Sequence, residues 1–140
     1  MIYNLSYIEE RKSKIMVMPY IHFNGNCEEA FTFYADCFGG EITFLSRFDN
    51  EPNSPVMHAT VMLTENGGVS GSDSDPPEPL PEKYEILVLF KTRAEVEVVF
   101  SKLSEGATDV TPFTPHPPPD EAGGGAYLVD KYGYHWMLCT

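Results

Sequence analysis

Histidine and hydroxyl side chains are the residues of this chain whose types and spacing could do chemistry. Among the four histidines, His58 alternates with Thr60 along the run from Val56 to Thr64, so a strand here would place both side chains on one face. On a face that lines a cavity, His58 would hydrogen-bond a ligand or act as a general base near neutral pH. The alternative is a structural histidine that neighbouring backbone groups satisfy. His22 lies between two apolar residues and has the same two interpretations.

Two carboxylates and two aromatic residues complete the candidates for a ligand pocket. Asp73 ends a Ser-Gly-Ser-Asp stretch, where its carboxylate would either point at a cavity mouth or form a turn. Glu85 lies in a strand-like run and would face either water or a cavity. Together with Phe23 and Phe44, Tyr127 and Trp136 could form an aromatic wall, while aromatic residues at alternating positions also build cores.

The charge and composition of the chain argue against several classes of partner. The formal net charge is -12, from 21 acidic and 9 basic residues, whereas nucleic-acid binding depends on Lys and Arg displacing counterions from phosphate. We therefore expect no nucleic-acid partner and no membrane partner, since no apolar run is long enough to span a bilayer either. The three cysteines form no CxxC pair and no even set, which indicates free thiols and a cytoplasmic location.

The elements that must position these residues form a pattern that occurs twice. In the first half, one amphipathic helix between Asn26 and Gly39 follows a strand and precedes three more. Asn26 with Glu29 predicts a capping box at the start of this helix, and Gly39 predicts its end. The predicted strands are residues 17–23, 41–48, 56–64 and 68–72.

The second half repeats this order after a proline-rich linker at residues 73–82. Thr92 with Glu95 predicts a second capping box, at the start of a helix that ends at Gly106. Strands are predicted at residues 83–91, 107–113, 126–130 and 134–139, with a long loop at residues 115–125. We therefore expect one α+β domain of two βαβββ modules, at about residues 17–72 and 83–140, after an N-terminal extension at residues 1–16.

Several short motifs carry a resemblance to a known family. They are Pro19-Tyr-Ile-His-Phe-Asn-Gly-Asn-Cys-Glu-Glu-Ala, Phe38-Gly-Gly-Glu41, Met57-His-Ala59 and Asp130-Lys-Tyr-Gly-Tyr-His-Trp-Met137. In this order they resemble the PhnB-like branch of the vicinal oxygen chelate superfamily, which includes glyoxalase I, bleomycin-resistance proteins and extradiol dioxygenases. That branch is often labelled a demethylubiquinone methyltransferase. The resemblance implies a glyoxalase-like fold, in which the two modules form a half-open curved mixed sheet, and a homodimer.

The resemblance also indicates where a metal would be held. Catalytic members of the superfamily hold a divalent ion through His, Gln or Glu on the first and last strands of each module. Those positions correspond here to Pro19, Thr60, Glu85 and Met137. Of these only Glu85 is a usual metal ligand, and a shift of the strand register could bring in His22, His58 or His135. We expect no glyoxalase-type metal quartet, and a divalent metal held by Glu85 and His58 is the alternative.

These observations predict a protein that binds a small molecule in the sheet cavity without the usual metal quartet. Two other functions remain open at this point. One is a divalent-metal-dependent lyase, isomerase or dioxygenase of the vicinal oxygen chelate superfamily. The other is a protein that sequesters an antibiotic, as bleomycin-resistance proteins do.

Overall fold

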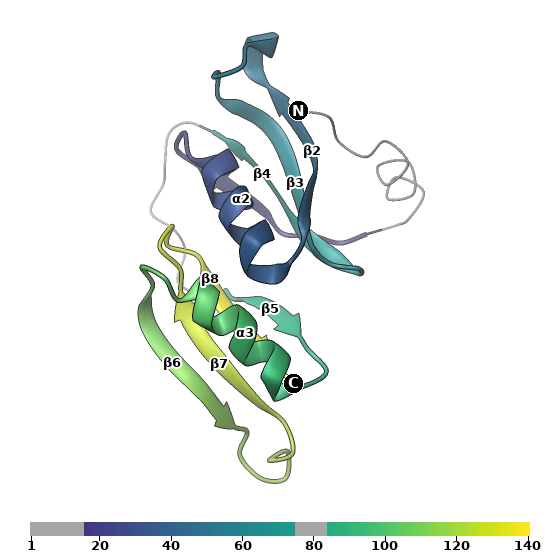
Figure 1. Cartoon of the computed structure of the whole chain (residues 1–140), viewed down its shortest axis with the longest axis vertical. Coiled ribbons are helices and arrows are strands. Elements are labelled where there is room, and N and C mark those ends of the chain that lie inside the picture. The colour runs from purple at the N-terminus through teal and green to yellow at the C-terminus, as the bar shows by residue number, and fades with distance from the viewer. Residues whose placement is uncertain (1–15, 75–83) are drawn as a thin grey trace. The chain divides into compact units, whose positions relative to one another are not determined.

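The computed structural model describes residues 16–74 and 84–140. Most of the predicted N-terminal extension and of the predicted linker lies outside these described residues. The chain forms two compact units, residues 1–78 and 79–140. Within the described residues, each unit consists of one α-helix and one four-stranded mixed sheet (Figure 1). The prediction of two βαβββ modules in an α+β, glyoxalase-like fold is therefore confirmed.

In the first module, two strands that are distant in sequence pair in parallel at one edge of the sheet. Its elements are β1 (Tyr20–Phe23), α2 (Cys27–Phe38), β2 (Glu41–Arg47), the short 3-10 helix η1 (Phe48–Asn50), β3 (Val56–Thr64) and β4 (Gly67–Asp73). The strand order is β1-β4-β3-β2, with β1 parallel to β4 and the other pairs antiparallel. β1 begins after Pro19, later than predicted, because proline has no N–H to donate within a sheet.

The second module repeats this topology. Its elements are β5 (Ile86–Leu89), α3 (Arg93–Leu103), β6 (Thr108–Pro115), β7 (Gly124–Val129) and β8 (His135–Cys139). The strand order is β5-β8-β7-β6, and β5 is parallel to β8. β6 continues to Pro115, two residues beyond its predicted end, because Pro115 pairs with Gly124 across the hairpin.

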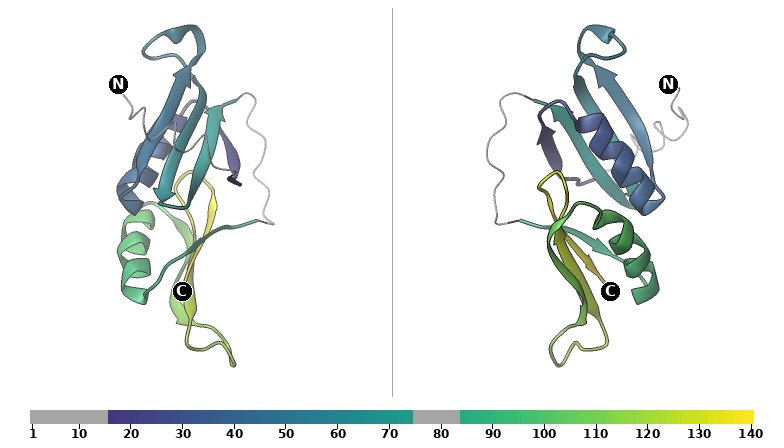
Figure 2. Two further views of the ribbon diagram at one scale, coloured as in Figure 1. Left: turned by 90° about the vertical axis from the view of Figure 1, so that its right-hand side faces the viewer. Right: turned by 60° about the vertical axis from the view of Figure 1, so that its left-hand side comes forward.

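Each helix covers one face of its own sheet, as two further views show (Figure 2). In the first module, a Cβ atom on Gly71 would lie 3.0 Å from the ring of Phe31 in α2, so Gly71 faces the helix. The phenyl rings of Phe23 and Phe31 also meet edge to face at 5.6 Å. Because side chains alternate along a strand, Ser70 and Ser72 on β4 must point to the opposite face.

The two helices start in different ways. At α3 the hydroxyl of Thr92 accepts a hydrogen bond from the backbone N–H of Glu95, and the Glu95 carboxylate accepts one from the backbone N–H of Thr92. This confirms the predicted capping box. At α2, Asn26 occupies the N-cap position but its side chain makes no capping hydrogen bond, so the predicted box with Glu29 is wrong. The carboxylate of Asp73, at the end of β4, accepts a hydrogen bond at the start of this helix instead.

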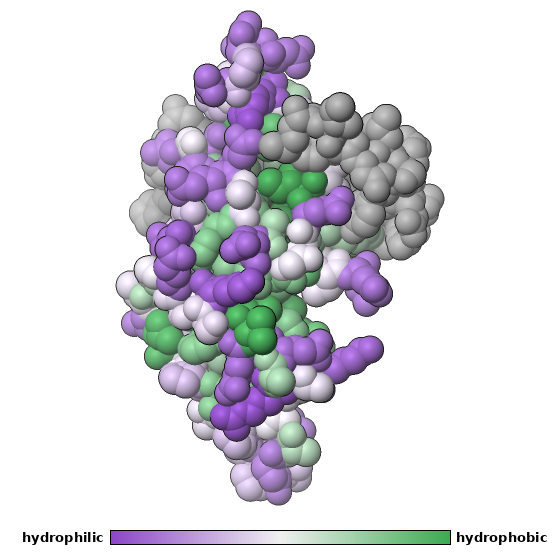
Figure 3. Space-filling model, viewed as in Figure 1, coloured by the Kyte–Doolittle hydropathy of each residue, from purple (hydrophilic) through white to green (hydrophobic). Residues whose placement is uncertain are grey.

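The surface is mixed in character. Hydrophilic residues and small clusters of hydrophobic residues are interspersed over the face shown in Figure 3. The three cysteines remain buried thiols. Neither α2 nor α3, the helices within residues 16–74 and 84–140, is long and apolar enough to cross a membrane.

Candidate functional site

Polar and aromatic side chains gather on the face of the first sheet that points away from α2. Strand register assigns each of them to this face, because paired residues on neighbouring strands point the same way. The residues are Tyr20, His22, Phe44, Ser46, His58, Thr60, Ser70 and Ser72. The structure therefore brings together three residues that the sequence singled out, namely His22, His58 and Thr60.

Four rings on this face form a continuous line, which we call the aromatic row: Phe44, His58, Tyr20 and His22. Successive ring centroids are 5.7, 5.6 and 5.3 Å apart, within the range of attractive aromatic contacts. The rings of His58 and Tyr20 are nearly parallel, at 16°. They come from β3 and β1, which β4 separates. Only small serines stand on β4 between them, so the two rings can meet above that strand.

Hydroxyl groups lie beside the aromatic row. Thr60 Oγ1 and Ser70 Oγ share a hydrogen bond of 2.8 Å, and both residues are buried. His58 Nδ1 lies 3.3 Å from the Tyr20 hydroxyl, at hydrogen-bonding distance. His22 Nδ1 makes a 2.5 Å hydrogen bond with Ser74 Oγ. The face thus combines ring surfaces with several groups that donate and accept hydrogen bonds.

Asp73 is engaged by backbone amides rather than aimed at this face. Its Oδ1 accepts a hydrogen bond from the N–H of Cys27, the first residue of α2, at 2.9 Å. Its Oδ2 accepts one from the N–H of Val56, the first residue of β3, also at 2.9 Å. A carboxylate at a helix start is stabilised by the exposed amides and the helix dipole. Asp73 therefore supplies the cap that Asn26 does not.

Two candidates lie on the face of the second sheet that points away from α3. Gly124 faces α3, because a Cβ atom there would lie 2.6 Å from the Phe113 ring, which the guanidinium of Arg93 in α3 covers. By alternation Tyr127 points the other way. Burial raises the pKa of Tyr127, and the negative charges of the Cys139 thiolate and of Glu85 raise it further. The charge of Glu85 thus acts on the Tyr127 hydroxyl.

Trp136 lies in the core of the second module. Its side chain is almost fully buried, and its Nε1 donates a hydrogen bond of 2.8 Å to Asp130 Oδ2. The other oxygen of Asp130 accepts from the backbone N–H groups of Tyr132 and Tyr134. Asp130 therefore holds the β7–β8 turn and the indole together, and Trp136 packs on the α3 side with Leu128, its partner in the sheet.

Sequence reasoning missed several residues of the aromatic row and its surroundings. Tyr20, Ser70 and Ser74 were not among the predicted site residues, although all three contact the predicted histidines or Thr60. A signal for Ser70 exists in the Ser70-Gly-Ser72 stretch, since small residues at alternating positions leave room for large side chains on neighbouring strands. The signal for Tyr20 depends on the parallel pairing of β1 with β4, which spans about fifty residues of sequence.

The residues at the family's metal positions do not fit a divalent cation. Pro19 has no side-chain donor, the Thr60 hydroxyl already bonds Ser70, and Met137 offers only a thioether, which suits soft metals. Glu85 is the one carboxylate of the four positions. Among residues 16–74 and 84–140, no three His, Cys, Asp or Glu side chains are grouped as a metal ion would require.

Comparison with known proteins gives a match over nearly the whole chain. Residues 15–139 match the family model described as 3-demethylubiquinone-9 3-methyltransferase. No curated protein matches the chain.

Solved structures also match the chain over most of its length. Protein PA1353 from Pseudomonas aeruginosa is 27% identical, with a TM-score of 0.76 over 89% of this chain and 96% of that one. The PhnB protein from Bacillus cereus is 29% identical, with a TM-score of 0.71 over 87% and 96%. A glyoxylase/bleomycin resistance protein/dioxygenase domain from Frankia sp. EAN1pec is 13% identical, with a TM-score of 0.65 over 90% and 94%. The last likeness concerns the fold alone.

Proposed function

Because the chain belongs to the 3-demethylubiquinone-9 3-methyltransferase family, in its PhnB-like form with a glyoxalase fold, we propose that it binds a small molecule against the aromatic row. Binding on this face would use no glyoxalase-type metal quartet. The observation that carries the proposal is the row itself: Phe44, His58, Tyr20 and His22 lie in line across one sheet face. Ligand sites typically combine such apolar and aromatic surface with a few convergent polar groups.

The polar groups beside the row give the proposal its chemistry. Tyr20 is 45% exposed and His22 is exposed, whereas His58 is half-buried. A ligand can therefore reach the ring faces, while the shared hydrogen bond of His58 and Tyr20 orients the imidazole. In this arrangement Tyr20 and His58 would contact polar atoms of the ligand, and the buried pair of Thr60 and Ser70 would hold β3 and β4 in register beneath it.

Thermal melting of the full chain tests this function. A set of metabolites is screened alone, and Zn, Ni, Mn and Fe(II) are screened with and without a chelator. A ligand present at a hundred times its Kd should raise the melting temperature by roughly 5 to 10 °C. A metal-induced rise that the chelator reverses would instead favour the metal-dependent lyase, isomerase or dioxygenase. A rise with a cationic glycopeptide alone would favour antibiotic sequestration, and one with S-adenosylmethionine would favour the methyl transfer of the family's description.

Variants of the row then locate the bound metabolite. We expect His58→Ala and Tyr20→Phe each to reduce affinity by about tenfold, the effect of losing one well-placed polar contact. His116→Ala is the matched control, because this histidine lies in the loop after β6 and outside the row. Unchanged affinity in both row variants would remove the aromatic row from the site.

We further propose that the protein acts as a cytoplasmic homodimer. The buried thiols Cys27, Cys37 and Cys139 support a reducing compartment. The fold supports dimerisation by analogy with the superfamily, and a two-fold interface is the commonest arrangement of identical chains.

A further inference from the structure

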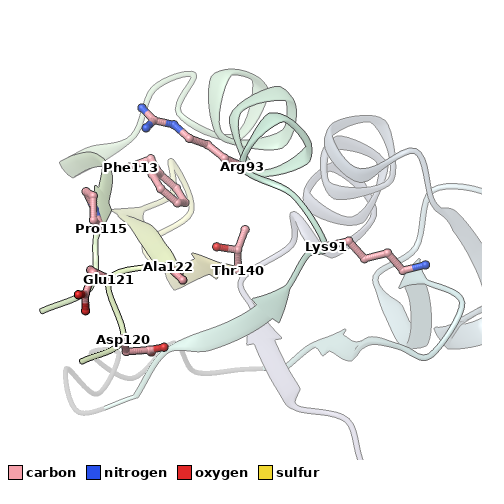
Figure 4. A pocket seen from close by; sticks show the side chains of 9 residues that line it. Lys91, Arg93, Phe113, Pro115, Asp120, Glu121, Ala122 and Thr140 are labelled. Atoms are coloured by element: carbon pink, nitrogen blue, oxygen red, sulfur yellow. The ribbon is translucent and has the colours of Figure 1, made fainter. Parts of the chain in front are cut away.

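The second module carries a cleft of about 550 Å³ that the proposed site does not use. It is bounded by the start of α3, the end of β6, the loop before β7 and Thr140, which follows β8 (Figure 4). All of its lining residues belong to the unit formed by residues 79–140. The cleft is thus a feature of one module and does not depend on the other.

Consecutive glycines let the walls of this cleft come together. A Cβ atom on Gly123 would lie 2.8 Å from the carbonyl oxygen of Thr140. A Cβ atom on Gly124 would lie 2.6 Å both from the Phe113 ring and from the carbonyl oxygen of Thr114. Any larger residue would force the backbone apart, since contacts under 3.0 Å are repulsive. The run Gly123-Gly124-Gly125 therefore serves close packing around the cleft.

The apolar floor of the cleft has a cation above it. The guanidinium carbon of Arg93 lies 4.7 Å from the centroid of the Phe113 ring, a favourable cation–π distance. Its Nε donates a 3.0 Å hydrogen bond to Glu97, which fixes the plane of the guanidinium. Its terminal nitrogens have no hydrogen-bond partner among the described residues. Arg93 therefore presents an oriented pair of donors.

Carboxylates occupy the other end of the cleft. Figure 4 shows Arg93 and Phe113 at one end and Asp120 and Glu121 at the other, and Lys91 points away from all of them. Within the described part of the chain, the carboxylates of Asp120 and Glu121 accept no hydrogen bond and form no ion pair. Opposite charges thus lie at the two ends of the cleft, with the Phe113 ring at the Arg93 end.

We propose that this cleft binds a zwitterionic ligand of the amino-acid or short-peptide class. The carboxylate of the ligand would pair with the two terminal nitrogens of Arg93, the geometry that guanidinium groups favour. Its ammonium group would lie between Asp120 and Glu121, and its aliphatic part would cover Phe113. A simple anion would be repelled by these carboxylates and by the net charge of -12. A simple cation would leave the terminal nitrogens of Arg93 without an acceptor.

Nuclear magnetic resonance of the full chain tests the proposal with defined probes. The probes are 4-aminobutanoate, 6-aminohexanoate and 8-aminooctanoate, which carry both charges at increasing separation. Hexanoate and hexylamine are the controls that carry one charge each. We expect saturable shifts of the amide signals of the glycine run with at least one zwitterion. We expect at least tenfold weaker binding of both single-charge controls at equal ionic strength.

Variants separate the cleft from general surface charge. Arg93→Lys keeps the charge but loses the paired donors, and Glu121→Gln removes one carboxylate. Each should weaken the best zwitterion by about fivefold. Glu105→Gln makes the same change of charge beside Lys131, outside the cleft, and should leave the affinity unchanged. The proposal is overturned if no zwitterion shifts the glycine signals, if hexanoate binds as tightly, or if Glu105→Gln weakens binding as much as Glu121→Gln.

Discussion

At the scale of the residue, hydroxyl groups in the first module differ sharply in how they are satisfied. Thr60 and Ser70 are buried and bond each other at 2.8 Å. Thr43 on β2 is as deeply buried, but its Oγ1 has no hydrogen-bond partner among residues 16–74 and 84–140. Burying an unpaired hydroxyl costs free energy, because the group loses its bonds to water and gains none. The register shift between Ile42 and Phe44 places Thr43 at an irregular point of the sheet.

The substitution Thr43→Val should stabilise the protein. Valine has nearly the same shape and removes the unsatisfied hydroxyl, so we expect the free energy of unfolding to rise by about 1 kcal/mol. Urea denaturation followed by circular dichroism measures the change. Thr60→Val is the matched control and should lower the stability by about 1 to 2 kcal/mol, because it strands the buried Ser70 hydroxyl. A destabilised Thr43→Val variant would mean that the hydroxyl has a partner in solution.

At the scale of the element, the start of α2 depends on a residue distant in sequence. Local sequence makes Asn26 the obvious cap, yet Asp73 at the end of β4 accepts the hydrogen bond from the first helical amide. The same carboxylate holds the first residue of β3. One side chain therefore joins a helix and two strands. It also fixes the end of β4 next to Ser74, which contacts His22 of the aromatic row.

This arrangement predicts a large loss of stability for one alanine substitution and a small loss for another. Asp73→Ala leaves two backbone amides without an acceptor, so it should lower the free energy of unfolding by about 2 to 3 kcal/mol. Asn26→Ala should cost less than about 0.5 kcal/mol, because its side chain makes no capping bond. Both values come from urea denaturation. If Asn26→Ala proves the more costly substitution, the local capping box forms in solution after all.

At the scale of the whole molecule, alkaline pH should destabilise the protein. Burial raises the pKa of the Cys27 thiol from 9.0 to about 12, and the negative charges of Asp73 and Glu28 add to the rise. Burial also raises the pKa of Tyr84. A group whose pKa is higher in the folded state stabilises the fold below its unfolded pKa, and this stabilisation is lost as the pH rises toward the folded value. We expect the free energy of unfolding to fall between pH 9 and pH 12.

Urea denaturation at a series of pH values measures this fall. Cys27→Ala serves as the comparison, because it removes one of the titrating groups and should make the pH dependence shallower whatever its effect on packing. Equal slopes for the two proteins would show that Cys27 does not contribute.

The proposed homodimer is a second prediction at this scale. Sedimentation equilibrium at micromolar concentration should give twice the mass of the monomer. A monomer over the whole concentration range would contradict the proposal. It would leave the aromatic row unaffected, because the row lies within one module.

Much of the fold could be predicted from the sequence, because the interactions that form the helices, caps and turns are local. Three features that were predicted correctly involve residues within four positions of each other. They are the stripe of apolar residues along α2, the capping box at Thr92 and the turn at Gly39. The alternation of His58 with Thr60 likewise placed both on one strand face. The parts that pattern missed, such as Asp73 as the cap of α2, depend on contacts between residues far apart in the chain.

By itself, then, the sequence determined the order of the elements, the repeat of the βαβββ module and the family, since periodicity, caps and short motifs are written along the chain. Only the tertiary structure decided which side chains meet. Tyr20 and His58 stack because β4, bearing small serines, lies between their strands. Phe113 occupies its place below Arg93 because glycine at position 124 leaves room for the ring. These contacts depend on strand order and register, which bring together residues whose proximity cannot be predicted from their spacing in the sequence.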